Sequence, residues 1–140
     1  MDLTALATTN IHAPAPRVWE ALTNPAIIKE YMFGTEVASS WKKGDPITWS
    51  GTWKGNPYRD KGVILEIAAP RLLKYSHFSP LVGLPDIPEN YHIVTIELTP
   101  KDSETHVSLS QDGNRSEEAR AHSQENWEAM LTALKATLEG

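Results

Sequence analysis

Apolar and polar residues alternate along the middle of the chain, from about residue 35 to residue 112. A period of two places successive side chains on opposite faces of an extended strand, so each alternating run predicts a strand with one buried face. The residues expected on the buried faces are Ile47, Trp49, Gly51, Trp53, Leu73, Tyr75, His77, His92, Val94, Ile96, Leu98, Val107 and Leu109. Because turn residues separate these short runs, we expect an antiparallel meander with one solvent-facing side.

The run over residues 63–67 carries apolar residues on both faces, and the charged side chain of Glu66 decides between them. We expect Glu66 to face solvent, which places Val63, Leu65 and Ile67 on the inner face. Ahead of this run, the segment Lys54-Gly55-Asn56-Pro57 predicts a turn. The stretch up to Ile11 predicts one further strand, although its alternation is weaker.

Two short helices are predicted near the N-terminus. Pro14 and Pro16 stand where the first turn of a helix tolerates proline, because the amides there have no partner inside the helix. Asn24 and Pro25 then read as an N-cap followed by proline at the first helical position, which predicts a second helix ending near Tyr31. Both helices are too short to form a core by themselves.

The strongest helical pattern runs from Ser116 to about Leu138, without proline or glycine. Its apolar positions recur at helical spacing and are Trp127, Met130, Leu131, Leu134 and Leu138. A sheet with one dry face must bury that face against such a helix. The element order predicts one α+β domain over residues 1–140 with a helix-grip fold, in which a curved antiparallel sheet wraps around the long C-terminal helix.

Three segments of the chain carry a resemblance to a known superfamily. They are Ala13-Pro14-Ala15-Pro16-Arg17-Val18-Trp19-Glu20-Ala21-Leu22-Thr23, then Asp60-Lys61-Gly62-Val63-Ile64-Leu65-Glu66 with Pro70 and Leu73-Lys74-Tyr75, and Asn126-Trp127-Glu128-Ala129-Met130-Leu131-Thr132-Ala133-Leu134. They resemble the START-like (SRPBCC) superfamily, which includes the birch pollen allergen (Bet v) fold. Within it the chain is similar to the family named after the activator of heat-shock protein 90 ATPase. The resemblance implies the helix-grip fold, in a superfamily whose members bind lipids, hormones and polyketides and a few of which catalyse reactions.

Composition removes several classes of function. The 140 residues carry a net charge of −5 and no cysteine, so disulfide scaffolds, thiol nucleophiles and thiolate metal sites are excluded. The acidic balance argues against a nucleic-acid partner, and no apolar run approaches the roughly 20 residues that cross a bilayer. The N-terminus lacks the features of a secretory signal, so we expect a cytoplasmic protein. Nucleotide-loop and serine-nucleophile motifs are missing, and we expect no cofactor.

Aromatic and apolar residues on the predicted inner faces suggest a ligand-binding wall. The candidates are Trp49, Trp53, Tyr75 and Trp127, joined by Met130, Leu131 and Leu134 from the C-terminal helix. Tyrosine and tryptophan combine large apolar area with a hydrogen-bond donor that can orient a ligand. The alternative is that these side chains only fill the core.

Two histidines, His77 and His92, fall on the inner faces of consecutive predicted strands. If those strands pair as a hairpin, both imidazoles lie at one end of the pocket. They could orient a ligand or act as acid and base, or they could be hydrogen-bonded core residues. His77 also stands where many members of the resembled family carry an aromatic residue, often tryptophan. Two histidines fall short of the three protein ligands of a catalytic zinc site, so we expect no metal.

A long segment over residues 79–90 joins the two histidine strands and contains three prolines. Its apolar residues are Leu81, Val82, Leu84 and Ile87, and they suit a lid over the pocket, a seal on the sheet edge or a dimer contact. The leading hypothesis is that the protein binds a small hydrophobic, aromatic or lipid-like ligand between the sheet and the C-terminal helix. The alternatives are a protein-interaction module related to chaperone ATPase activators and a cyclase- or hydratase-type enzyme using His77 or His92.

Overall fold

The computed structural model describes residues 3–53, 55–80 and 83–139, and of Trp53 it describes the backbone alone. The elements in chain order are β1 (Ala5–Ile11), α1 (Ala15–Thr23), α2 (Pro25–Tyr31), β2 (Glu36–Ser39), β3 (Pro46–Trp53), β4 (Asn56–Ala68), β5 (Leu72–His77), η2 (Pro88–Asn90), β6 (His92–Lys101), β7 (Glu104–Gln111) and α3 (Glu117–Glu139). The described residues include no helix that is both long enough and apolar enough to cross a bilayer.

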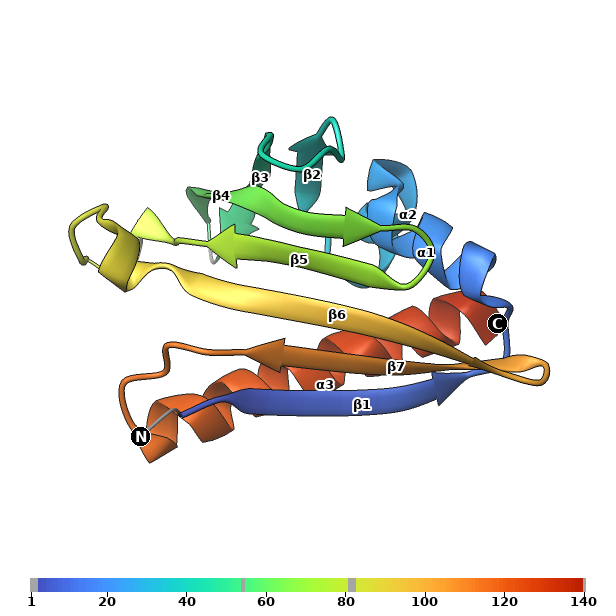
Figure 1. The fold of residues 1–140 in the computed structure, drawn as a ribbon. Helices are drawn as coiled ribbons and strands as arrows, with labels where there is room; N and C mark the ends of the chain where they lie inside the picture. The colour runs from blue at the N-terminus through green and yellow to red at the C-terminus, as the bar shows by residue number, and fades with distance from the viewer. Residues whose placement is uncertain (1–2, 54, 81–82, 140) are drawn as a thin grey trace.

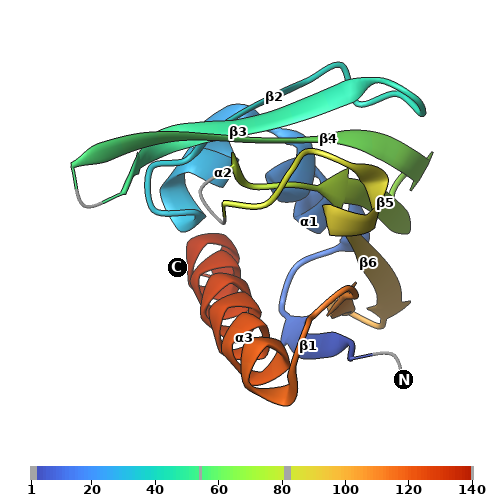
Figure 2. The same ribbon diagram turned by 90° about the vertical axis from the view of Figure 1, so that its left-hand side faces the viewer.

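Seven antiparallel strands form one sheet in the order β1-β7-β6-β5-β4-β3-β2. Figure 1 shows that β1 follows β7 at one edge, although the two strands stand at opposite ends of the chain. The sheet bends strongly, so that β2, β3 and β4 lie above α3 and β1 lies below them beside the helix (Figure 2). This arrangement confirms the predicted α+β fold with a long C-terminal helix and two short N-terminal helices.

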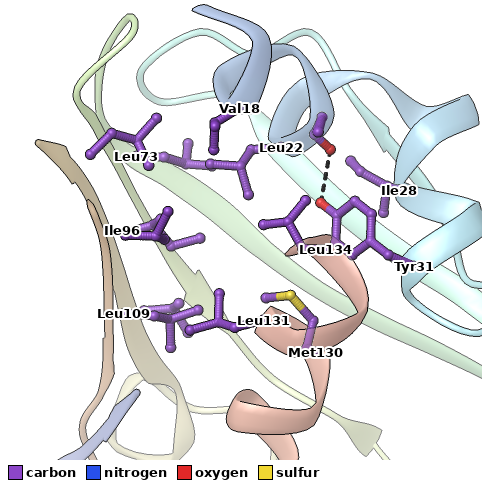
Figure 3. Close-up of a cluster of buried hydrophobic side chains, with 14 of the residues drawn as sticks. Val18, Leu22, Ile28, Tyr31, Leu73, Ile96, Leu109, Met130, Leu131 and Leu134 are labelled. Atoms are coloured by element: carbon purple, nitrogen blue, oxygen red, sulfur yellow. Dashed lines mark hydrogen bonds between the residues drawn. The ribbon is translucent and has the colours of Figure 1, made fainter. Parts of the chain in front are cut away.

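Local sequence explains how α1 and α2 meet. The side chain of Asn24 accepts a hydrogen bond from the backbone N–H of Ala26 at 3.0 Å, which is the predicted N-cap of α2. Ala21 lies in the last turn of α1, and the residue four positions on is Pro25, which has no N–H to donate to the Ala21 carbonyl. The Tyr31 hydroxyl donates to this carbonyl instead, at 2.8 Å, and Figure 3 shows the bond. The junction is therefore held by a side chain from α2.

The core lies between the concave face of the sheet and α3. From the sheet come Leu73, Ile96 and Leu109, and from α3 come Leu131 and Leu134, all nearly inaccessible to solvent (Figure 3). The two short helices close the same cluster from the far side, with Val18, Leu22, Ile28 and Tyr31 pointing into it. The apolar stripe predicted for the C-terminal helix is thus buried from Met130 to Leu138, whereas Trp127 is only partly buried.

The inner face predicted for residues 63–67 is wrong for the first part of this strand. Ile64 is fully buried, whereas Val63 is 39% exposed. The pairing of β4 with β5 shifts register between Ile64 and Glu66, and this irregularity returns Ile67 to the core side. A single charged residue shows which alternate positions face the core only as far as the strand stays regular. Glu66 therefore predicts the inward orientation of Ile67 correctly and that of Val63 incorrectly.

The turn predicted over residues 54–57 is too long: β3 ends at Trp53, Asn56 and Pro57 already belong to β4, and Lys54 lies outside the described residues. Gly55 has φ +82°, a conformation that glycine adopts without steric cost. However, β4 begins at Asn56, well before the run from which it was predicted, and β2 was not predicted as a separate strand. The early start of β4 adds inward-facing polar residues ahead of the apolar run.

Candidate functional site

Two adjoining clefts open between the sheet and the helix α3. The first has a volume of about 530 Å³ and reaches from Met32 and Tyr58 to Asp60. The second has a volume of about 880 Å³ and reaches from His77 and His92 toward the start of α3. We call them the Asp60 lobe and the histidine lobe. They share the lining residues Ser79, Gln111, Ser123, Asn126 and Trp127, so they form one continuous groove open to solvent.

The first half of β4 supplies the polar floor of the Asp60 lobe. Tyr58 and Asp60 alternate with Arg59 along the strand, so their side chains share the face that continues into the buried Ile64. The Tyr58 hydroxyl lies 2.7 Å from Thr35 Oγ1. Its ring passes over Gly51 of β3, where an added Cβ would lie only 2.8 Å from the Tyr58 oxygen. Glycine at position 51 therefore makes room for the tyrosine.

Asp60 contacts His77 across two paired strands. Its Oδ2 lies 2.9 Å from His77 Nε2, and the two side chains are 17% and 29% exposed. The other carboxylate oxygen, Oδ1, is buried and has no hydrogen-bond partner in the described part of the chain. An unpaired buried acceptor of this kind costs about 1–3 kcal/mol. A ligand that brings a donor to Oδ1 would remove that cost.

The rings of Trp49 and His92 flank His77. Trp49 meets His77 edge-on, with ring centroids 5.0 Å apart. His77 and His92 are direct partners in the β5–β6 ladder, as the hairpin hypothesis expects, and their ring centroids lie 6.5 Å apart. His92 Nδ1 lies 2.9 Å from the backbone carbonyl of Asp112. Both imidazoles therefore have one nitrogen held by an oxygen acceptor.

A glycine keeps His92 in this position. Gly113 adopts φ +73°, and a Cβ there would lie 3.1 Å from His92 Nδ1. The preceding residue, Asp112, also fixes the start of β6, because its side chain accepts a hydrogen bond from the Ile93 N–H at 2.6 Å. The β7–α3 connection thus sets the orientation of the second histidine.

The helix α3 forms the opposite wall. The Trp127 indole N–H donates to the side-chain carbonyl of Gln111, which comes from the end of β7. Trp127 is partly buried against the core and also lines both lobes, while Met130 is buried one turn further on. This wall therefore combines apolar surface with the amide of Asn126, which is exposed in the shared part of the groove.

The segment after β5 is tied to the outer face of β4. The Lys61 ammonium pairs with the Asp86 carboxylate, and the Tyr91 hydroxyl donates to the same carboxylate at 2.6 Å. Both bonds hold the pKa of Asp86 below its ordinary value, and the bond to Asp86 raises the pKa of Tyr91. Phe78 stacks on Tyr91, with ring centroids 5.1 Å apart.

Residues of this segment also border the groove. Ser79 lines both lobes, and Leu84, Glu89 and Asn90 line the histidine lobe. Ile87 is 43% exposed. Leu81 and Val82, two of the apolar residues in the lid hypothesis, lie outside the described residues.

The described residues that were predicted to contact a ligand, as apolar wall or as polar histidines, divide into two groups. His77, His92, Trp127 and Met130 border the groove. Trp49 and Tyr75 are 6% exposed and pack against each other in the core, and Leu131 and Leu134 are buried there as well. The Trp53 side chain lies outside the described residues.

The space behind Trp49 and Tyr75 is small. It measures about 30 Å³, which is room for no more than about two water molecules. Burial in this dry region raises the pKa of the Tyr75 phenol above its ordinary value. The groove that can accept a larger molecule lies nearer to the surface than the predicted pocket behind Trp49 and Tyr75.

Sequence reasoning missed Tyr58, Asp60 and Gln111. Tyr58 and Asp60 come directly after a predicted turn, and no apolar run around them indicates that the strand β4 has already started. The alternation of Tyr58, Asp60, Gly62 and Ile64 is the signal that could have identified this face. Gln111 has the same parity as Val107 and Leu109, so extending the β7 alternation by one step also places it inside.

The chemistry available in the groove is that of hydrogen bonding and proton transfer. Among the described residues no group of three or more histidine, aspartate or glutamate side chains is arranged to hold a metal ion. The groove instead combines a carboxylate, two imidazoles and amides with the apolar surface of Trp127 and Met130. This combination suits a small molecule with an apolar body and a few polar groups.

Comparisons with known proteins agree with this fold. Residues 12–139 match the model of a protein family described as "Activator of Hsp90 ATPase homolog 1-like protein". The solution structure of ChR145 from Cytophaga hutchinsonii is 55% identical, with a TM-score of 0.86 over 97% of this chain and 93% of that one. No curated protein matches the sequence.

More distant structures share the fold. CalU16 from Micromonospora echinospora is 23% identical, with a TM-score of 0.71 over 94% of this chain and 71% of that one. The Aha1 dimer from Colwellia psychrerythraea is 16% identical, with a TM-score of 0.76 over 97% and 96% of the two chains. Because the family model covers nearly the whole sequence, the chain belongs to the Activator of Hsp90 ATPase homolog 1-like family.

Proposed function

We propose that the protein binds a small, largely apolar ligand in the groove formed by the Asp60 and histidine lobes. The observation that carries this proposal is that Asp60 lines an open cleft of about 530 Å³ and that its buried Oδ1 has no hydrogen-bond partner among the described residues. Apolar walls supply affinity through surface burial, and the carboxylate supplies selectivity for a ligand with a hydroxyl or N–H donor. Aromatic compounds with a phenolic hydroxyl meet both requirements.

A blocking substitution tests the location of the site. Asn126 is exposed and lines both lobes, whereas Glu128 is exposed on the same helix and lines neither. Asn126→Trp should fill the groove without removing a core contact, and Glu128→Trp is the matched control. A ligand at about 100 times its dissociation constant stabilises the protein by about 2.7 kcal/mol.

The measurement is a thermal-shift screen with fatty acids, flavonoids, sterols and polyketide-like aromatics. We expect the stabilisation by any hit to survive Glu128→Trp and to vanish in Asn126→Trp. A hydroxyflavone should bind more tightly than the parent flavone, and Asp60→Ala should remove that difference. Equal stabilisation of both tryptophan variants would show that the ligand binds elsewhere.

Membership in the chaperone-activator family supports a second candidate, a protein-interaction module. The side chain of Phe33 is 81% exposed at the border of the Asp60 lobe, as expected for a residue that contacts a partner. Stimulation of an Hsp90 ATPase by the purified protein, lost in Phe33→Ala, would favour this function. A flat ligand screen with no stimulation would exclude both candidates.

A further inference from the structure

Two imidazoles line the histidine lobe, and each has one nitrogen within hydrogen-bond distance of an oxygen atom. His77 Nε2 lies 2.9 Å from Asp60 Oδ2, and His92 Nδ1 lies 2.9 Å from the Asp112 carbonyl oxygen. Within the described part of the chain, His77 Nδ1 and His92 Nε2 have no hydrogen-bond partner. The unoccupied nitrogens belong to rings that border an open cleft of about 880 Å³.

These contacts fix where each ring carries its proton. An ionised carboxylate and a backbone carbonyl accept hydrogen bonds but donate none, so the nitrogen facing each of them must carry hydrogen. A neutral His77 is therefore protonated at Nε2 and has its lone pair at Nδ1. A neutral His92 is protonated at Nδ1 and has its lone pair at Nε2. The second partner of a histidine sets its tautomer in this way at many functional sites.

We infer that the groove is a proton-transfer site in which His77 Nδ1 is the general base and Asp60 is its positioning residue. This inference rests on the proposed function, because a substrate must first enter the groove. The substrate class is a small neutral aromatic or carbonyl compound with a C–H bond made acidic by an adjacent electron-withdrawing group. His77 Nδ1 takes that proton, and the electron pair of the broken C–H bond moves toward the electron-withdrawing group of the substrate.

His77 has better support as the base than His92. Its held nitrogen faces a carboxylate, which stabilises the imidazolium formed when the ring accepts a proton, whereas His92 faces a neutral carbonyl. The T-shaped contact with Trp49 also restricts the His77 ring, with centroids 5.0 Å apart. The nearby His92 then serves to contact a polar group of the substrate, since its ring lies 6.5 Å away.

Elimination of nitrobenzisoxazole provides a direct assay, because its rate depends on a base and needs no other reactant. The base removes the proton on the ring carbon, the C–H electron pair forms the nitrile, and the N–O bond breaks with its electrons on oxygen. The product is a coloured cyanonitrophenolate, and the proton stays on the imidazole until solvent removes it. The compound is flat, neutral and apolar, as the groove requires.

We expect saturable turnover by the full chain and a fall in kcat of about a hundredfold in His77→Gln, the lower range for a positioned general base. His106→Gln is the matched control, because His106 lies on β7, bonded to Asn10, and does not line the groove. Its turnover should equal that of the parent protein. Thermal unfolding of each variant separates loss of the base from loss of the fold.

The role of Asp60 is tested by how kcat and KM change. Asp60→Asn should lower kcat with little change in KM, and Asp60→Glu should restore part of kcat. Nitrogen-15 NMR gives a readout that is independent of turnover: the neutral His77 ring should carry its proton on Nε2, and the neutral His92 ring on Nδ1. The opposite tautomer at His77 would overturn the inference.

Binding of the probe is followed separately, through quenching of tryptophan fluorescence by the nitro group. Saturable quenching without turnover above that of free imidazole would overturn the inference and leave the proposed function intact. Turnover that survives His77→Gln would do the same. Absence of both quenching and turnover would instead count against ligand binding in the groove, and the proton-transfer role would fail with it.

Discussion

Replacing Tyr31 by phenylalanine tests whether a side chain completes the junction between the two short helices. The substitution removes one hydroxyl from a residue that is 3% exposed. That hydroxyl donates to the Ala21 carbonyl at 2.8 Å, and Pro25 cannot replace it because proline has no N–H. The variant thus leaves a backbone acceptor without a partner in a closed part of the core.

The magnitude follows from this geometry. A buried acceptor left unsatisfied costs about 1–3 kcal/mol, and the slightly more apolar phenylalanine ring offsets part of that cost. We expect the free energy of unfolding to fall by about 1–2 kcal/mol at neutral pH. For a domain of 140 residues this corresponds to a drop in melting temperature of about 3–6 °C.

Urea titration and calorimetry measure the change, with Tyr91→Phe as the control. Tyr91 loses the same hydroxyl, but its partner is the exposed carboxylate of Asp86. We expect the control to lose less than about 0.5 kcal/mol. If Tyr31→Phe is as stable as the parent protein, then water or a shifted backbone satisfies the Ala21 carbonyl, and the tyrosine hydroxyl does not stabilise the junction.

Alkaline pH gives the same substitution a second signature. Burial, with a smaller contribution from Tyr75, raises the pKa of the Tyr31 phenol above the ordinary value of 10.0. Above that pH the unfolded chain releases a proton that the folded protein retains, so stability falls by about 1.4 kcal/mol per pH unit for this group. Tyr31→Phe lacks this loss, and its stability should approach that of the parent protein between about pH 10 and pH 11. A difference that stays constant over this range would contradict the pKa direction.

Two further predictions concern the strand β4. Gly62→Ala should destabilise the protein by about 3 kcal/mol or more, because the added Cβ would lie 1.7 Å from the backbone oxygen of Ser76. Gly44→Ala is the control in the same urea titration. It should cost about 1 kcal/mol, because the position has φ +88° but open space around it. Lys61→Met should raise the pKa of Asp86 toward the ordinary value of 3.8, because the lysine bond is the largest cause of its depression. Carbon-13 NMR of the Asp86 carboxyl group measures this pKa, which would not change if Tyr91 alone kept it low.

Much of the fold was predictable because its signals are local. The pattern of apolar residues records which face of each element is buried, and burial of apolar area dominates folding. This pattern is clear in the alternation over residues 92–98 and 107–109 and in the helical stripe that ends at Leu138. The proline and asparagine signals around Asn24 are equally local, because they act on the backbone within one turn. These signals suffice to predict the helix-grip order of elements.

The candidate site was predictable only in part. The parity that places His77 and His92 on the inner face follows from a period of two, and their pairing follows from the hairpin between β5 and β6. Whether an aromatic residue on that face lines a groove or fills the core depends on the local separation of the sheet from α3. Trp127 borders the groove and Tyr75 does not, although both follow the expected pattern.

The sequence by itself determined the class of fold, the inner and outer faces of the regular strands, and the apolar stripe of the final helix. The tertiary structure decided the register shift in β4 that buries Ile64 in place of Val63, and it brought Asp60 to His77. The physical reason is the distance along the chain over which each effect acts. Periodicity is a local pattern that shows which side of an element avoids water. A carboxylate–imidazole contact between residues 17 positions apart depends instead on how two strands pair in space.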